Sequence, residues 1–172
     1  MNGFWAAALE LGLIEFLLEE VDLPNSIALR LASEADCAVL LQWRNDPITV
    51  AMSLVSEPVP LDDHVRWFNG VLANPSRHLL IGEADGVRYG TVRFDEIDDT
   101  AEISITVNPE FRGQGIGGKL LAAADVWAKE ELHLGRIIAQ IKNDNPASLA
   151  IFHKAGYEIT KPGEVNSLVK YL

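Results

Sequence analysis

The chain has 172 residues, of which 48% are hydrophobic and 23% are charged. This length and composition are typical of one globular domain. They exclude a collagen, a coiled coil and, with Cys37 as the only cysteine, a disulfide scaffold. A net charge of −11 argues against nucleic acid and anionic membranes as the main partners, because both select basic surfaces.

Residues 1–26 contain acidic but no basic side chains, with apolar residues at helical spacing. This pattern predicts an acidic amphipathic helix that precedes a domain over residues 27–172. Two interpretations stay open, a segment docked on the domain and a contact within a homodimer. Glu10 and Glu15 interrupt the apolar run, so neither a signal peptide nor a membrane span is expected, and we expect a cytoplasmic protein.

The first part of the domain combines short strands with amphipathic helices. Residues 27–31 alternate as in a strand, and Ser33 is a candidate N-cap for a helix that ends near Asn45, because Pro47 disfavours helix before it. Residues 53–60 predict an irregular loop. The next helix has an apolar stripe made of Leu61, Val65, Phe68 and Leu72.

The second part predicts a hairpin and then alternating helices and strands. Asp85-Gly86 is a hairpin turn signal between strands, and Gly156 is a good C-terminal cap for a short helix. This order of elements is typical of a mixed α/β domain. The predicted strands are 78–83, 87–94, 100–107, 136–142, 157–160 and 168–171, and the helices are 117–131 and 146–155.

The glycine-rich segment VNPEFRGQGIGGK, residues 107–119, matches two famous spacings only in part. A dinucleotide fingerprint needs its glycines directly after a strand, and a phosphate loop needs Ser or Thr where Leu120 stands. What remains is a glycine turn at a helix start, where backbone N–H groups and the helix dipole favour an anion. Arg112 and Lys119 add positive charge, so the segment predicts a site for a pyrophosphate-sized ligand.

Arg112-Gly113-Gln114-Gly115-Ile116-Gly117 resembles the R/Q-x-x-G-x-G/A signature of the GCN5-related N-acetyltransferases. A second stretch resembles that family's N-x-x-S…Y-x-K-x-G-F motif, through Asn145, Ser148, Phe152, Lys154, Gly156 and Tyr157. The resemblance implies a mostly antiparallel sheet flanked by helices, the acyl-CoA N-acyltransferase fold. It also implies acetyl transfer from acetyl-CoA to a small-molecule amine, with no metal. The implied cofactor residues are Thr106 and Val107 for the pantetheine arm, Arg112, Gly113, Gln114, Gly115, Ile116, Gly117, Gly118 and Lys119 for the pyrophosphate, and Asn145 and Ser148 beside the arm.

The strand over residues 100–107 alternates apolar side chains with Glu102, Ser104 and Thr106. A central strand covered on both faces should be apolar on both, so a polar row suggests an open cleft. The resemblance implies that Glu102 is the general base, and the alternative is a surface carboxylate on an edge strand. Phe152 stands where the family has the Tyr that acts as general acid and protonates the leaving thiolate. We therefore expect that a water molecule, or no group at all, supplies this proton. We expect Tyr157 to pack in the core.

Trp43-Arg44-Asn45-Asp46 and a following His64 and Trp67 resemble acetyltransferases of nucleotide-linked amino sugars, including those of pseudaminic-acid-type pathways. The ribosomal-protein and polyamine acetyltransferases are a less close match. Arg44, Asn45, His64 and Trp67 are the candidate acceptor residues, with packing or ion pairing as the alternative. Two other functions stay open, a nucleotide binder or oxidoreductase that uses the same glycines and a catalytically weak acyl-CoA-binding module.

Overall fold

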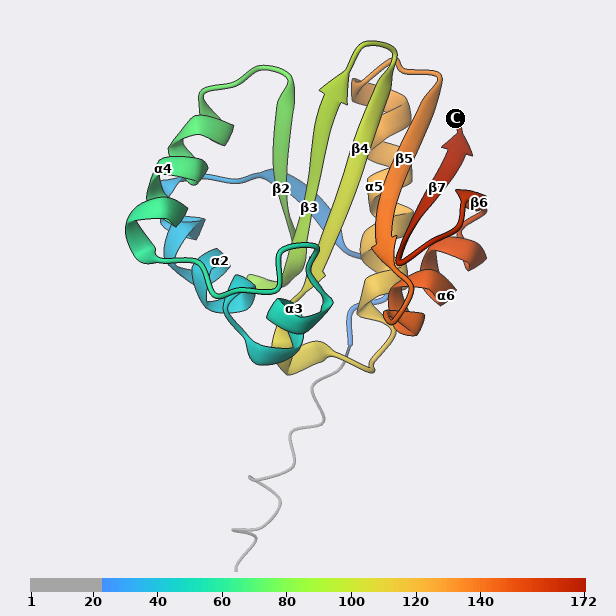
Figure 1. Ribbon diagram of the computed structural model, residues 1–172. Coiled ribbons are helices and arrows are strands. Elements are labelled where there is room, and N and C mark those ends of the chain that lie inside the picture. The colour runs from blue at the N-terminus through green and yellow to red at the C-terminus, as the bar shows by residue number, and fades with distance from the viewer. Residues whose placement is uncertain (1–22) are drawn as a thin grey trace, which may run out of the picture.

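The computed structural model describes residues 23–172 (Figure 1). The helix predicted within residues 1–26 therefore lies mostly outside the described residues. One sheet contains seven strands in the order β1-β2-β3-β4-β5-β7-β6. Only β4 and β5 pair in parallel, so the predicted mixed, mostly antiparallel architecture is confirmed. The strands are β1 (Ala28–Leu31), β2 (Arg77–Ala84), β3 (Val87–Ile97), β4 (Thr100–Val107), β5 (Arg136–Lys142), β6 (Glu158–Lys161) and β7 (Val165–Tyr171).

The helices mostly follow the predicted ranges, with one addition, α3. The sequence pattern predicted that a helix ends before Pro47, and α3 begins there, because Pro fits the first turn of a helix. The Asp46 carboxylate caps α3 by accepting from the backbone N–H groups of Ile48 and Thr49. The helices are η2 (Glu34–Asp36), α2 (Cys37–Arg44), α3 (Pro47–Met52), α4 (Leu61–Leu72), η3 (Pro109–Phe111), α5 (Ile116–Glu131) and α6 (Pro146–Lys154).

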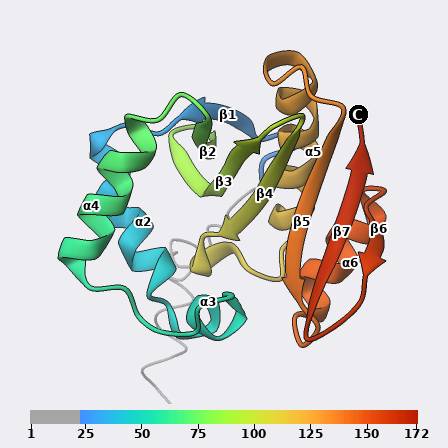
Figure 2. The same cartoon turned by 45° about the horizontal axis from the view of Figure 1, so that its top comes forward.

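Helices cover both faces of the sheet (Figure 2). A hydrophobic cluster lies on each face. Helices α5 and α6 cover one face, where Leu120 packs over the paired glycines Gly82 and Gly90. A Cβ on either glycine would lie within 2.6 Å of the Leu120 side chain, so both glycines let α5 approach the sheet closely. Helices α2 and α4 pack against β2 on the other face, with Leu79 and Ile81 in their cluster.

The buried side of α4 differs from the stripe that its sequence predicted. Leu61, Val65 and Leu72 are exposed, and the buried residues are His64, Phe68 and Val71. Adjacent stripes on a helix differ by one residue, about 100° of rotation. The sequence offered two such stripes, and the contact with Leu79 and Ile81 selects the one that contains His64.

A buried carboxylate, Asp36, joins β1 and β3 to the start of the helical layer. Its side chain is fully buried, and it accepts hydrogen bonds from Arg30 at 2.7 and 3.0 Å and from the Ser33 backbone N–H at 2.9 Å. The Arg88 Nε lies 3.0 Å from the same carboxylate. The hydrogen bonds from Arg30 are the largest cause that lowers the pKa of Asp36 to about 2.

We therefore expect Asp36 to stabilise the fold in a pH-dependent way. The pKa of Asp36 is lower in the folded protein than in the unfolded chain, where it is about 3.9. The ionised carboxylate therefore stabilises the folded state at any pH above about 3.9, and this stabilisation is lost as the pH falls through about 2. Urea unfolding should show that Asp36→Asn costs about 2–3 kcal/mol at pH 7 and much less near pH 2. A cost that stays constant between pH 5 and pH 2 would contradict this role.

Candidate active site

Strands β4 and β5 part at the edge of the sheet where the glycine loop begins. They pair from Thr100 to Ile103 on β4, but no β4–β5 pair follows, although β4 continues to Val107 and β5 to Lys142. The backbone groups that β4 turns toward β5 beyond Ile103 therefore have no strand partner. Thr106 and Val107, the residues predicted to contact the pantetheine arm, lie on this unpaired stretch and are partly buried.

The loop after β4 leads into the N-terminus of α5, and its geometry suits a phosphate group. Gly113 and Gly115 have φ values of 75° and 78°, which disfavour any residue with a Cβ. Over residues 23–172, no side chain caps α5 at Gly115, so the first backbone N–H groups of this 16-residue helix have no capping partner in that range. A Cβ on Gly113, Gly115 or Gly118 would project into open space. The loop therefore offers an anion an accessible row of backbone donors.

The long polar and charged side chains of this loop are engaged elsewhere. Arg112 Nη2 lies 2.6 Å from both the Asp46 carboxylate and the Thr49 hydroxyl, and it lowers the pKa of Asp46. Lys119 donates to the Pro24 carbonyl at 2.6 Å. The Gln114 amide donates to Glu110 O at 3.1 Å. A pyrophosphate at this loop would therefore meet backbone N–H groups first, and Arg112 instead ties the loop to α3.

The parallel pairing of β4 and β5 brings the start of α6 to the same edge as the glycine loop. Asn145 caps α6, and its Oδ1 accepts from the Ser148 backbone N–H at 3.1 Å. Lys142, at the end of β5, donates to Ala51 O at 2.8 Å. The glycine loop after β4 and the end of β5 therefore both hold α3, through Arg112 at its start and Lys142 near its end.

The polar row predicted on β4 lies on the sheet face opposite α5, beside a matching row on β3. Glu102 pairs with Asp95, and Ser104 pairs with Arg93. None of these four side chains is fully buried. Within the described residues Glu102 has no hydrogen bond or ion pair, so its carboxylate is open to a ligand. Arg93 and Asp95 were not among the predicted site residues. A hairpin with its turn at Asp98-Asp99 nevertheless places them opposite Ser104 and Glu102.

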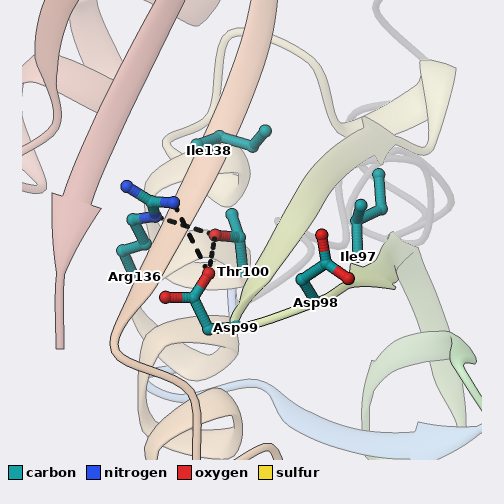
Figure 3. Close-up of a pocket in the computed structure, with 6 residues that line it drawn as sticks. All are labelled: Ile97, Asp98, Asp99, Thr100, Arg136 and Ile138. Carbon is teal, nitrogen blue, oxygen red and sulfur yellow. Dashed lines mark hydrogen bonds and ion pairs between the residues drawn. The ribbon is translucent and has the colours of Figure 1, made fainter.

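A surface depression of about 240 Å³ continues this open face beyond Glu102 (Figure 3). Arg136 donates from Nε to the Thr100 hydroxyl at 2.8 Å, and its Nη2 lies 3.5 Å from Asp99. The depression begins at Thr100, two residues before Glu102 on β4. If the amine of an acceptor lies at Glu102, the rest of the acceptor has room in the depression. Its lining residues are Ile97, Asp98, Asp99, Thr100, Arg136 and Ile138.

The four candidate acceptor residues separate into two groups. Arg44 donates to Val55 O and Glu57 O, and the Asn45 amide exchanges two hydrogen bonds with the Val59 backbone, so both hold the loop over residues 53–60. His64 is buried and donates from Nε2 to Cys37 O at 2.9 Å. These three residues therefore have structural contacts, and we do not carry them into the proposed acceptor site. The fourth, Trp67, is partly buried beneath Arg93 at the open face.

The two aromatic residues near the end of α6 lie in the core. The rings of Phe152 and Tyr157 meet edge to face at 4.9 Å. Tyr157 donates to Asp125 Oδ1 at 3.0 Å, and burial raises its pKa well above the usual value for tyrosine. The expectation that Tyr157 packs is confirmed.

Over residues 23–172, no group of three or more His, Cys, Asp or Glu side chains could hold a metal ion. In the same range, no helix has the length and apolar character needed to cross a membrane.

Comparisons with known proteins agree on one family. Residues 26–158 match the model described as "Acetyltransferase (GNAT) domain". An L-methionine sulfoximine/L-methionine sulfone acetyltransferase of Salmonella typhimurium is 28% identical over 145 residues, which cover 78% of this chain and 81% of that relative. An L-amino acid N-acyltransferase of Escherichia coli is 29% identical over 143 residues, with the same coverage of both chains.

Solved structures share the fold. Spermidine N-acetyltransferase from Vibrio cholerae, in complex with CoA and spermine, has a TM-score of 0.76 at 18% identity and covers 86% of this chain and 96% of its own. An aminoglycoside acetyltransferase in complex with coenzyme A and kanamycin has a TM-score of 0.73 at 23% identity, with coverage of 85% and 95%. At these identities the likenesses show the fold alone.

Proposed function

The chain belongs to the acetyltransferase (GNAT) family, and on this premise we propose that it transfers the acetyl group of acetyl-CoA to the primary amine of an amino acid or a similar small molecule. One observation carries the proposal. The end of β4 that has parted from β5, the N-terminus of α5 and the carboxylate of Glu102 all belong to one continuous segment, residues 100–119.

The residues present fit acetyl-CoA, which supplies the thioester carbonyl. The backbone N–H groups at Gly115 and the first turn of α5 would hold the pyrophosphate, because they are uncapped and no Cβ obstructs them. The unpaired edge of β4 at Thr106 and Val107 would pair with the pantetheine arm. Asn145 caps α6 at the same edge and would border the arm from that side.

Glu102 is the proposed general base. A lysine-like amine with a pKa of about 10.4 is neutral only about once in a few thousand molecules at pH 7, and only the neutral amine attacks. A positioned base contributes about 10²–10⁴ in rate. Glu102 has no partner among the described residues and shares its face with Ser104 and Thr106, which lead toward the parted strands.

The acceptor class follows from the relatives rather than from the sequence resemblance. The resemblance favoured nucleotide-linked amino sugars, through residues such as Arg44 and His64 that the fold uses for its own contacts. The relatives are named for L-amino acids, L-methionine sulfoximine and L-methionine sulfone. A putative phosphinothricin acetyltransferase of Bacillus subtilis is also 30% identical over 142 residues, which cover 76% of this chain and 83% of that relative. We therefore propose α-amino acids as the first candidates for the acceptor.

Two measurements test the function. Saturating acetyl-CoA at about 100 times its Kd should stabilise the protein by about 2.7 kcal/mol, a rise in Tm of about 5–10 °C, whereas NAD and ATP should not. Release of the CoA thiol should then be followed with L-methionine sulfone, spermidine, kanamycin and a UDP-linked 4-amino sugar as acceptors. Stabilisation by NAD alone, or no thiol release with any acceptor, would refute the proposal.

A further inference from the structure

The open face around Glu102 contains one more ionisable cluster, formed by Arg77, Arg93 and Asp95. Arg77 holds the Asp95 carboxylate through Nε at 2.7 Å and Nη2 at 3.4 Å. Arg93 Nε lies 2.9 Å from Asp95 Oδ2, the oxygen that also accepts from Arg77 Nη2. Two guanidinium groups thus share one carboxylate, and the cluster has one positive charge in excess.

Arg93 is held in place with donors to spare. Its guanidinium lies 5.9 Å from the centroid of the Trp67 ring, a cation–π arrangement, and its side chain is only 27% exposed. Its contact with Asp95 is an ion pair without hydrogen-bond alignment, and no side-chain hydrogen bond of Arg93 occurs within the described residues. The Nη atoms of Arg93 therefore have donor capacity for a ligand.

Glu102 and Arg93 are diagonal neighbours on paired strands. Glu102 pairs with Asp95, and Arg93 pairs with Ser104. Ser104 lies two residues after Glu102 on β4, so Arg93 lies nearer the glycine loop than Glu102 does. Diagonal neighbours on one sheet face have their Cα atoms about 7–8 Å apart, within reach of long side chains. No ion pair between Arg93 and Glu102 occurs in the described structure, so a positive and a negative group stand side by side without neutralising each other.

From this juxtaposition we infer that the acceptor is a zwitterionic α-amino acid whose carboxylate binds Arg93 while its amine faces Glu102. This inference rests on the proposed function and deepens it. An α-amino acid has its amine and carboxylate on one carbon, so it can bridge the two groups. A guanidinium recognises a carboxylate through paired N–H donors. A polyamine would instead bring a second cation toward Arg93. The amino-acid side chain would extend along the face toward the depression at Ile97 and Ile138.

The test compares three acceptors that share one side chain: L-methionine sulfone, its α-carboxamide and the corresponding amine without the carboxylate. The quantity measured is kcat/KM, corrected for the neutral fraction of each amine. The natural protein should prefer the amino acid over the other two acceptors by about 10–100-fold. Arg93→Gln should abolish that preference by lowering kcat/KM for the amino acid, and it should change kcat/KM for the carboxamide by less than about 3-fold.

Two further variants make the test specific. Arg93→Lys keeps the charge but not the paired donors, so it should retain part of the preference. Arg66→Gln, at an exposed arginine of α4, should leave all three acceptors unaffected. Activity of Arg93→Gln on the carboxamide also shows that this variant is folded. If it does not fold, Arg93→Lys and the acceptor preference of the natural protein decide the question.

Three results would overturn the inference. One is an equal loss on all three acceptors in Arg93→Gln, which would indicate a structural role. Another is a natural protein that does not distinguish the amino acid from its carboxamide. The third is acetylation of spermidine or kanamycin with no amino acid accepted, which would leave the proposed acetyltransferase function standing. Failure of that function has a different signature, the absence of CoA release with every acceptor.

Discussion

Replacing Glu102 by glutamine lowers kcat/KM at pH 7 by about 100-fold or more, if this carboxylate removes the proton from the amine. Glutamine keeps the size and polarity of the side chain but cannot accept the proton. The loss should shrink as the pH rises, because an amine that deprotonates in solution no longer needs the base. A pH–rate profile of kcat/KM for both proteins, with L-methionine sulfone as the acceptor, measures the effect.

Two controls separate the role of Glu102 from damage to the fold. Acetyl-CoA affinity should hardly change in Glu102→Gln, because the carboxylate lies on the open face and not on the unpaired edge of β4. Glu158→Gln, at an exposed position of β6, should retain full activity. Full activity of Glu102→Gln at pH 7 would refute the assignment of the base.

The glycine loop allows an equally sharp test, because the chain contains a matched control. Gly115 and Gly86 have φ values of 78° and 77°, and a Cβ on either would meet no atom within 4 Å. Valine at either position therefore causes the same backbone strain, about 1–3 kcal/mol. Only Gly115 lies at the uncapped start of α5, whereas Gly86 lies in the hairpin turn between β2 and β3.

We expect Gly115→Val to weaken acetyl-CoA binding by at least about 10-fold, since the new side chain would separate the phosphate from the backbone N–H groups. Gly86→Val should lose similar stability and bind acetyl-CoA normally. Urea unfolding and calorimetric titration of both variants measure the two effects. Equal acetyl-CoA affinity in two equally folded variants would place the pyrophosphate elsewhere.

Much of the local structure could be predicted, because the signals that define it lie within a few residues. Asp85-Gly86 forms a turn with both φ values positive, as a two-residue hairpin of this kind requires. Ser33 and Asp36 form a capping box at the start of η2. Gly156 ends α6 with a φ of 88°. Strands β4 and β5 have the predicted bounds.

Side-chain partners far apart in the sequence could not be predicted in this way. Arg112 looked like a free cation beside the glycines, and only the packing of α3 brings Asp46 and Thr49 to it. The sequence left His64 as either a packing residue or an acceptor contact, and the rotation of α4 against Leu79 and Ile81 buries it. Each of these outcomes depends on contacts between segments far apart in the sequence. The spacing of residues within one segment does not show which of these contacts forms.

The sequence by itself determined the order of the seven strands, the position of the glycine loop at the start of α5 and the polar row that contains Glu102, since each depends on neighbouring residues or on the period of a strand. Tertiary structure alone decided where β4 and β5 part, which cations remain available and that Arg93 stands beside Glu102. The reason is physical. Strand register and helix rotation are set by the burial of side chains from many segments at once, and a charge is available to a ligand only if no other segment brings it a partner.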